Sequence, residues 1–126
     1  MNAFRSLAAA LCLSLLAAPA LAKPPVCRSL PPDIKEAMRD MSYCMTMVNP
    51  VVECGRQGMD VQVFNNDQGK LPNAGRGQEY WEGKIRRDGA AGTRRLVYLM
   101  TMGVRKNIVQ ARYYSPDHYA TFCQIN

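Results

Sequence analysis

Histidine is nearly absent from this sequence, which contains one, His118, among 126 residues. An imidazole exchanges protons most readily near neutral pH, so any such chemistry points to His118. The segment Ser115-Pro116-Asp117 before it is typical of a turn. The alternation after this turn predicts a strand that begins at His118. Taken alone, the histidine could equally be a hydrogen-bonded surface residue, so the rest of the chain has to decide.

Long apolar segments are also scarce. The longest, residues 7–16, is too short for a transmembrane helix, which needs about 20 apolar residues. Arg5 precedes it, and the Ala20-Leu21-Ala22 segment that follows is typical of a signal-peptide cleavage site. We therefore expect residues 1–22 to be a secretory signal peptide. Residues 23–126 would then form an exported, soluble domain without a membrane partner.

The cysteines lack the CxxC spacing of a zinc site. Cys12 falls in the predicted signal peptide, which leaves Cys27, Cys44, Cys54 and Cys123. An even number in an exported chain predicts two disulfides, for which three connectivities are possible. We favour Cys44–Cys54, which are close in sequence, and Cys27–Cys123, which would join the ends of the domain. The latter closes a loop of about 97 residues, worth roughly 4–5 kcal/mol in chain entropy.

Acidic residues are fewer than basic ones, 10 against 16. Without Arg5 of the predicted signal peptide, 15 basic residues remain, and the net charge becomes about +5 on a domain of about 104 residues. This charge favours a polyanionic partner such as a nucleic acid. The length suits one small domain.

The apolar spacing after residue 32 predicts one helix. Asp33, which follows two prolines, is placed to cap it, and Asn49-Pro50 should end it. Its methionines fit core packing better than metal binding, because they fall on the stripe that the helix has to bury. The apolar stripe consists of Ile34, Ala37, Met38, Met41, Met45 and Val48.

Alternating residues downstream predict a sheet. The expected strands are residues 61–64, 80–85, 95–100 and 107–114, with a polar loop at 65–72 and a turn at 89–92. Together with the strand at His118 they make about five antiparallel strands packed on one helix, an α+β fold. Within strand 80–85, Trp81 is expected to face the core and Glu82 to face outward.

Five segments form a pattern across residues 23–126. They are Val26-Cys27-Arg28-Ser29-Leu30-Pro31-Pro32, Val63-Phe64-Asn65-Asn66 with Gly69-Lys70-Leu71-Pro72, Glu82 before Ile85, Gly92-Thr93-Arg94-Arg95-Leu96, and Asp117-His118-Tyr119-Ala120-Thr121-Phe122. This pattern resembles the microbial guanyl-specific, barnase-like ribonuclease family, and the last two segments at that separation are specific to it. The resemblance implies a helix packed on a twisted antiparallel sheet whose concave face holds the active site.

The resemblance also implies cleavage of single-stranded RNA on the 3′ side of guanosine through a 2′,3′-cyclic phosphate, with no metal and no cofactor. Glu82 matches the general base, His118 the general acid and Arg95 the residue that stabilises the phosphate. Glu79 competes with Glu82 for the role of base, but alternation places Glu79 on the side of Trp81.

The chain departs from the family at the phosphate site. Members usually carry a second arginine where this chain has Ala91. Phosphate binding would then rest on Arg95, with help from Lys84, Arg86 or Arg87.

The implied base site departs from the family as well. The glutamate that reads guanine is matched here by Gln68, whose neutral amide offers guanine a weaker hydrogen-bond partner. Asp67 could restore a carboxylate by a small loop shift. We expect cleavage mainly after G, with appreciable cleavage after A. The other implied substrate-binding residues, which act through stacking and backbone amides, are Phe64, Asn65, Asn66 and Tyr119.

A different class of function stays open. A disulfide-linked basic module that binds polyanions or a partner protein without catalysis, such as a decayed ribonuclease, explains the charge and the cysteines equally well. It does not explain the joint presence of Glu82, Arg95 and His118. For the enzyme we expect a secreted monomer with single-stranded RNA as its partner. An acidic inhibitor protein, which the hosts of some family members keep, would be a second partner.

Overall fold

The computed structural model describes residues 23–87 and 90–126. The predicted signal peptide and residue 89 of the predicted turn lie outside these residues, and the rest of that turn belongs to a strand. No helix of the described residues is long and apolar enough to cross a membrane. The elements are α1 (Pro32–Cys44), α2 (Pro50–Arg56), β1 (Val61–Phe64), β2 (Gln78–Arg87), β3 (Ala90–Thr101), β4 (Ile108–Ser115) and β5 (Cys123–Ile125).

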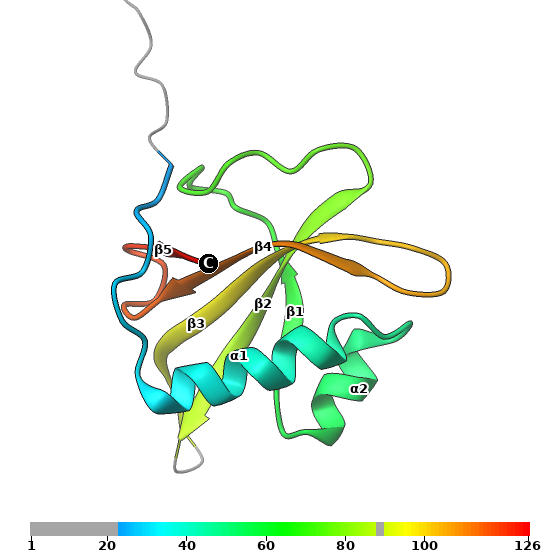
Figure 1. Cartoon of the computed structure of the whole chain (residues 1–126), viewed down its shortest axis with the longest axis horizontal. Helices are drawn as coiled ribbons and strands as arrows, with labels where there is room; N and C mark the ends of the chain where they lie inside the picture. Colours follow the sequence, from blue (N-terminus) through cyan, green and yellow to red (C-terminus); the bar gives the residue numbers. More distant parts are fainter. Residues whose placement is uncertain (1–22, 88–89) are drawn as a thin grey trace, which may run out of the picture.

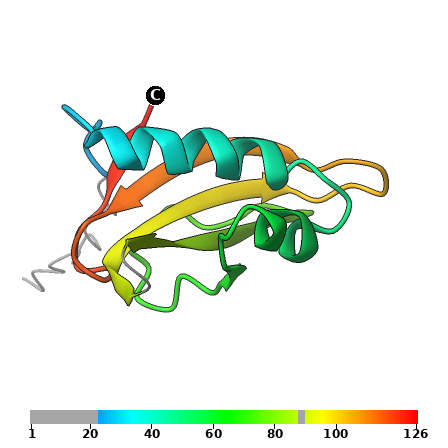
Figure 2. The ribbon, with the colours of Figure 1, turned by 90° about the horizontal axis from the view of Figure 1, so that it is seen from below.

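The five strands form one antiparallel sheet in the order β1-β2-β3-β4-β5, so every strand pairs with its neighbours in sequence (Figure 1). The sheet is strongly twisted, and α1 lies across one of its faces (Figure 2). The predicted α+β fold with five antiparallel strands is confirmed. The predicted number of helices is wrong, because residues 23–87 and 90–126 contain two.

The start of α1 differs from the prediction in its cap. The helix begins at Pro32, whose fixed φ suits the first helical position. Asp33 lies within the first turn, where its charge favours the helix dipole, and no side chain caps the helix. The Asp33 carboxylate instead binds the guanidinium of Arg94 at 2.6 Å, which ties the helix to β3.

The end of α1 comes earlier than predicted, at Cys44 instead of Asn49. The backbone amides of Thr46 and Met47 bond to carbonyls three residues before them, the tighter spacing with which helices commonly finish. Val48, expected on the buried stripe, is 67% exposed as a result.

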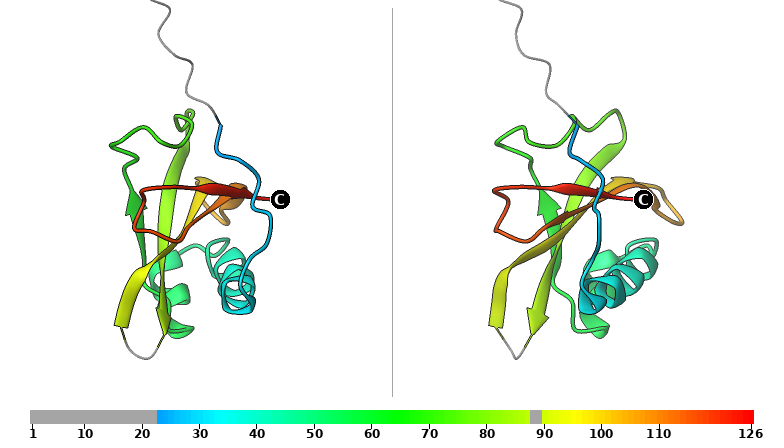
Figure 3. Two further views of the ribbon diagram at one scale, coloured as in Figure 1. Left: turned by 90° about the vertical axis from the view of Figure 1, so that its left-hand side faces the viewer. Right: turned by 60° about the vertical axis from the view of Figure 1, so that its left-hand side comes forward.

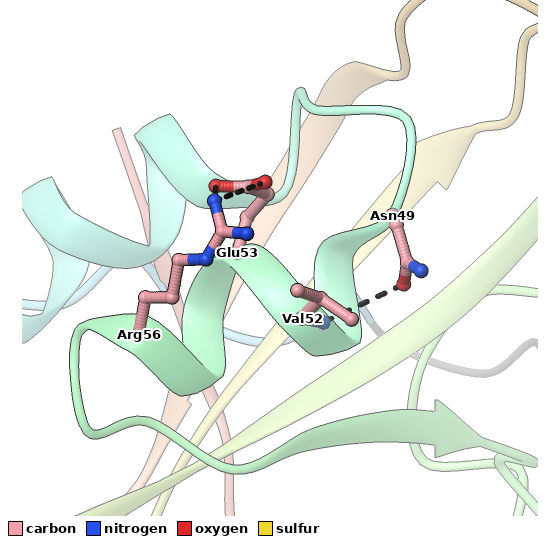
Figure 4. A network of polar contacts seen from close by, with 4 residues as sticks. All are labelled: Asn49, Val52, Glu53 and Arg56. Carbon is pink, nitrogen blue, oxygen red and sulfur yellow. Dashed lines mark hydrogen bonds and ion pairs between the residues drawn. The ribbon is translucent and has the colours of Figure 1, made fainter.

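The second helix, α2, was not predicted. Asn49 and Pro50 were interpreted as the end of one helix, and they begin another: the Asn49 side chain caps α2 by accepting from the Val52 amide (Figure 4). Glu53 and Arg56 pair across one turn of this helix at 3.1 Å. An N-cap residue followed by proline at the first helical position is a start signal as well as a stop signal.

Apolar side chains fill both faces of the sheet. On the helix side, Trp81 and Ile85 of β2 pack with Ile34 and Met41 of α1. On the opposite side, Tyr80 packs with Val97 and three further buried residues. These three are Leu71, Tyr113 and Phe122. The predicted alternation in β2 is therefore confirmed, and the face opposite the helix is apolar around its centre.

Both favoured disulfides are present, Cys27–Cys123 and Cys44–Cys54, with sequence separations of 96 and 10. The first joins the segment before α1 to β5, and Val26 forms a parallel bridge to Gln124 beside it. Figure 3 shows this N-terminal segment passing beside β5 at the edge of the sheet. The ends of the domain are thus closed on each other.

Removing the two disulfides should destabilise the domain unequally. The chain-entropy model gives roughly 4–5 kcal/mol for a loop of 96 residues and about 3 kcal/mol for one of 10. The double variant Cys27→Ala with Cys123→Ala should therefore lose about 2 kcal/mol more than Cys44→Ala with Cys54→Ala, measured by urea unfolding. Equal losses would contradict a mechanism based on loop length.

Candidate active site

Glu82 and Arg95 lie on the face of the sheet opposite α1. Glu82 pairs in register with Val97, and Lys84 pairs with Arg95, so these four side chains share one face. Glu82 faces away from Trp81 as predicted, but it is not the outward, solvated carboxylate that alternation suggested. Only 4% of Glu82 and 5% of Arg95 are exposed. Both charges are therefore held largely out of water.

The hydroxyl of Tyr119 joins these two buried charges. It donates to Oε2 of Glu82, and Nε of Arg95 donates to it at 3.1 Å. The other carboxylate oxygen of Glu82 accepts from the Gln62 amide. Arg95 also donates to the backbone carbonyl of Gly92 at 2.6 Å. Buried charges persist only when they are paired and hydrogen-bonded, and this network meets that requirement.

Tyr119 remains a hydrogen-bond donor at any working pH. Burial, together with the hydrogen bond to Glu82, raises the pKa of Tyr119 to about 12. The hydroxyl thus keeps its proton, and Glu82 can accept from it as a carboxylate. The arrangement holds Glu82 in place without removing its capacity to act as a base.

His118 lies in a turn and not at the start of a strand, which corrects the prediction. β5 begins only at Cys123. His118 and Tyr119 have φ of 54° and 73°, in the left-handed region that side chains other than glycine rarely occupy. The His118 amide donates to the Thr93 carbonyl at 2.7 Å, and its exposed imidazole stands 4.8 Å from the Tyr119 ring.

Asp117 explains why the alternation after it does not form a strand. Its carboxylate accepts from the Thr121 hydroxyl at 2.6 Å, from the Thr121 amide at 2.9 Å and from the Ser115 hydroxyl at 3.0 Å. These bonds, those from Thr121 foremost, lower the pKa of Asp117 below its ordinary value. Side-chain capture of backbone amides of this kind favours turns over strands.

A cavity of about 370 Å³ opens beside Glu82. Its walls come from β1, from the loop after β1 and from the turn that carries His118. It is lined by Gln62, Val63, Phe64, Asn65, Asn66, Asp67, Gln68, Lys70, Glu82, Tyr119 and Phe122. All five residues predicted to bind the nucleobase are among them. Glu82, the predicted general base, lines the cavity as well. Arg95 and His118 do not line this cavity, but both contact Tyr119, which does.

The loop after β1 is shaped by its own side chains. Asn66, with φ of 53°, makes two hydrogen bonds to the backbone of Leu71 through its side-chain amide. Its NH₂ group donates to the Leu71 carbonyl at 2.8 Å, and its oxygen accepts from the Leu71 N–H at 3.1 Å. Leu71 is buried and fixes the loop to the core. The Asn66 side chain is thus engaged within the loop, where it stabilises the shape of the turn.

The aromatic rings of the cavity already stack on each other. Phe64 and Tyr119 have ring centroids 5.2 Å apart and an angle of 25° between their planes. Tyr119 therefore contributes both to the aromatic wall of the cavity and to the hydrogen-bond network around Glu82.

The other residues that the sequence offered for catalysis, Glu79 and Lys84, lie on opposite faces of the sheet. Glu79, the competing base, accepts from the Trp81 indole at 3.0 Å on the helix side of the sheet, away from the cavity. Lys84 lies across from Arg95 in the register of β2 and β3. The side chains of Arg86, Arg87 and Ala91 lie outside what the structure describes.

Sequence reasoning assigned no role to two polar residues of the site, Gln62 and Lys70. Gln62 alternates with Phe64 along β1 and so faces the same side, a signal present in the sequence. Lys70 bonds backbone carbonyls far away in the chain, which no local pattern indicates. Among the described residues, no group of three or more histidine, cysteine or acidic side chains could hold a metal ion.

The sequence profile of the ribonuclease family matches residues 29–126. This chain belongs to the microbial ribonuclease family. The solved structure of ribonuclease Sa2 with guanosine-2′-cyclophosphate is similar to it, at 31% identity and a TM-score of 0.55, over 83% of this chain and 97% of that one. No curated protein sequence matches it significantly. The resemblance inferred from the sequence is confirmed, and the enzyme is an endoribonuclease.

The Tyr119 hydroxyl should stabilise this ribonuclease measurably. Tyr119→Phe keeps the ring on Phe64 but leaves Glu82 and Arg95 each without one hydrogen bond, so the free energy of unfolding should fall by about 1–3 kcal/mol. Tyr43→Phe is the matched control, because Tyr43 is 61% exposed and its change should stay within about 0.5 kcal/mol. Equal unfolding free energies for both variants would show that the network contributes nothing.

Proposed function

We propose that this ribonuclease is exported and cleaves single-stranded RNA on the 3′ side of guanosine, without a metal ion, through a 2′,3′-cyclic phosphate. The observation that carries the proposal is the buried carboxylate of Glu82, which lines a cavity of about 370 Å³ together with aromatic rings and a polar loop. The guanosine nucleotide in the ribonuclease Sa2 structure supports guanine as the base. Two disulfides support an oxidising destination outside the cytoplasm.

The reaction needs one base and one acid. Glu82 takes the proton of the ribose 2′-hydroxyl, and the 2′-oxygen forms a bond to phosphorus. The bond between phosphorus and the 5′-oxygen of the next nucleotide breaks, and His118 gives its proton to that oxygen. The products are a 2′,3′-cyclic phosphate and a free 5′-hydroxyl.

Cations on the same face of the sheet stabilise the negative charge that develops on the phosphorane. Arg95 is held on this face by backbone carbonyls and by Tyr119, which fixes the position of its charge before substrate binds. Lys84, which pairs in register with Arg95 and so shares its face of the sheet, is our candidate for a second cation. It would fill the role of the second arginine that Ala91 replaces.

Base recognition combines stacking with the loop after β1. Phe64 and Tyr119 supply aromatic faces, and the backbone of Asn65 and Asn66 supplies amides for the oxygen of guanine. Gln68 lines the same cavity and offers a neutral acceptor in place of a carboxylate. The enzyme should therefore prefer G over A by a modest factor.

A basic module that only binds polyanions is a poorer explanation. A binding surface has no use for a carboxylate that is buried at the mouth of the cavity, where it repels phosphate. Burying Glu82 also carries a desolvation penalty that a module without catalysis would not need.

Digestion of RNA by the pure protein in a chelator tests the reaction. The native enzyme should cleave at an undiminished rate and leave 2′,3′-cyclic phosphate ends, because neither proton transfer involves a metal. His118→Ala should lower kcat by about 100-fold or more, since it removes the acid. Its unfolding midpoint should not change, because the imidazole is exposed.

Two outcomes would contradict this proposal. Cleavage that stops in the chelator would point to a metal nuclease. RNA binding without any cleavage by the native protein would instead favour the module that binds polyanions.

The identity of residue 68 should set the strength of base preference. Gln68→Glu restores a charge-assisted acceptor, which is worth about 1–2 kcal/mol more than a neutral one, so the ratio of G to A cleavage should rise roughly tenfold. Sequencing the product ends of a mixed RNA gives this ratio for each variant. Gln57→Glu, at an exposed position outside the cavity, controls for the added charge. Strict G cleavage by the native enzyme, unchanged in Gln68→Glu, would show that Gln68 does not read the base.

A further inference from the structure

Lys70 joins the two loops that meet at the cavity. It lies two residues after Gln68 in the loop between β1 and β2, and it lines the cavity. Its ammonium group donates to the backbone carbonyl of Tyr119 at 3.1 Å and to that of Ala120 at 2.9 Å. Both carbonyls belong to the turn that carries His118. Lys70 is therefore a direct connection between the base-binding loop and the turn of the general acid.

The position of the His118 imidazole depends on the backbone of this turn. The imidazole is exposed, and its recorded ring neighbour is Tyr119, the next residue in the chain. His118 and Tyr119 both hold left-handed conformations, which are unfavourable for them and persist only where the surroundings impose them. A change in either φ would move the imidazole relative to Glu82 and Arg95.

The turn is held from two sides. On the sheet side, the His118 amide donates to the Thr93 carbonyl at 2.7 Å, and the Tyr119 amide donates to the Ser115 hydroxyl at 2.9 Å. On the other side, Lys70 holds the carbonyls of the same segment. Hydrogen bonds from an ammonium group are charge-assisted, so this second contact is stronger than a neutral hydrogen bond at the same place would be.

We propose that Lys70 is a positioning residue for the general acid. It fixes the carbonyls of Tyr119 and Ala120 so that the His118 imidazole meets the departing 5′-oxygen. The inference rests on the proposed function, because it assumes that His118 protonates the leaving group.

Two substrates that differ only in the leaving group separate positioning from general stability. Guanylyl-3′,5′-uridine expels a ribose 5′-oxygen, which needs a proton from His118. Guanosine 3′-(4-nitrophenyl phosphate) forms the same bond from the 2′-oxygen to phosphorus but expels 4-nitrophenolate, which leaves with its electron pair and needs no proton. Lys70→Met should lower kcat on the first substrate by about 10- to 100-fold and on the second by at most about threefold.

Three variants serve as references. His118→Ala should show the same dependence on the leaving group, with a larger loss on the dinucleotide. Lys70→Arg keeps donors within reach of the carbonyls and should recover most of the rate. Lys106→Met removes an exposed lysine between β3 and β4 and should change neither rate.

Amide hydrogen exchange tests the same contact without substrate. In Lys70→Met, the amides of His118 and Thr121 should exchange faster, while those of β3 stay protected. Unchanged exchange in the turn would overturn the proposal, and so would equal rate losses on both substrates or none on either. If the native protein cleaves neither substrate, the proposed function fails, and the exchange result alone decides whether Lys70 holds the turn.

Discussion

The bridge from Glu82 through the Tyr119 hydroxyl to Arg95 is the interaction on which the site depends. It holds two opposite charges in a largely dry position beside the apolar cluster on this face of the sheet. Neither charge would be stable there alone, because an unpaired buried ion carries a penalty of several kcal/mol. The bridge requires that β2 and β3 pair in the observed register, and the sheet provides this pairing. It also requires that Tyr119, near the end of the chain, lie beside both charges, and one short turn places it there.

Several parts of the fold together position Tyr119 beside Glu82 and Arg95. The turn from Ser115 to Thr121 is closed by the Asp117 carboxylate, and β5 follows at once. Cys123, the first residue of β5, is bonded to Cys27, so the strand after the turn cannot leave the edge of the sheet. The disulfide thus constrains the active site as well as the unfolded chain. This explains why a small meander sheet, with few residues to spare for packing, can hold two left-handed residues in one turn.

The sequence allowed the sheet, both disulfides and the family to be predicted, because each depends on a local period or on a distinctive pattern. Alternation placed Trp81 and Glu82 on opposite faces, as observed. It could not show that Glu82 is buried, since burial comes from Tyr119, 37 residues away. The helix boundary failed for a different reason: Asn49 and Pro50 are equally good at ending one helix and starting the next. The strand expected at His118 failed because side-chain bonds from Asp117 outcompete a pattern of alternation.

One tyrosine links the aromatic rings of the cavity to the buried charges. Phe64 and Tyr119 stack on each other, and the same Tyr119 donates to Glu82. The stacking surface and the Glu82 carboxylate therefore share one residue, so a displacement of the Tyr119 ring would alter both. Because Arg95 also donates to this hydroxyl, the position of one ring affects the stacking surface and both buried charges together.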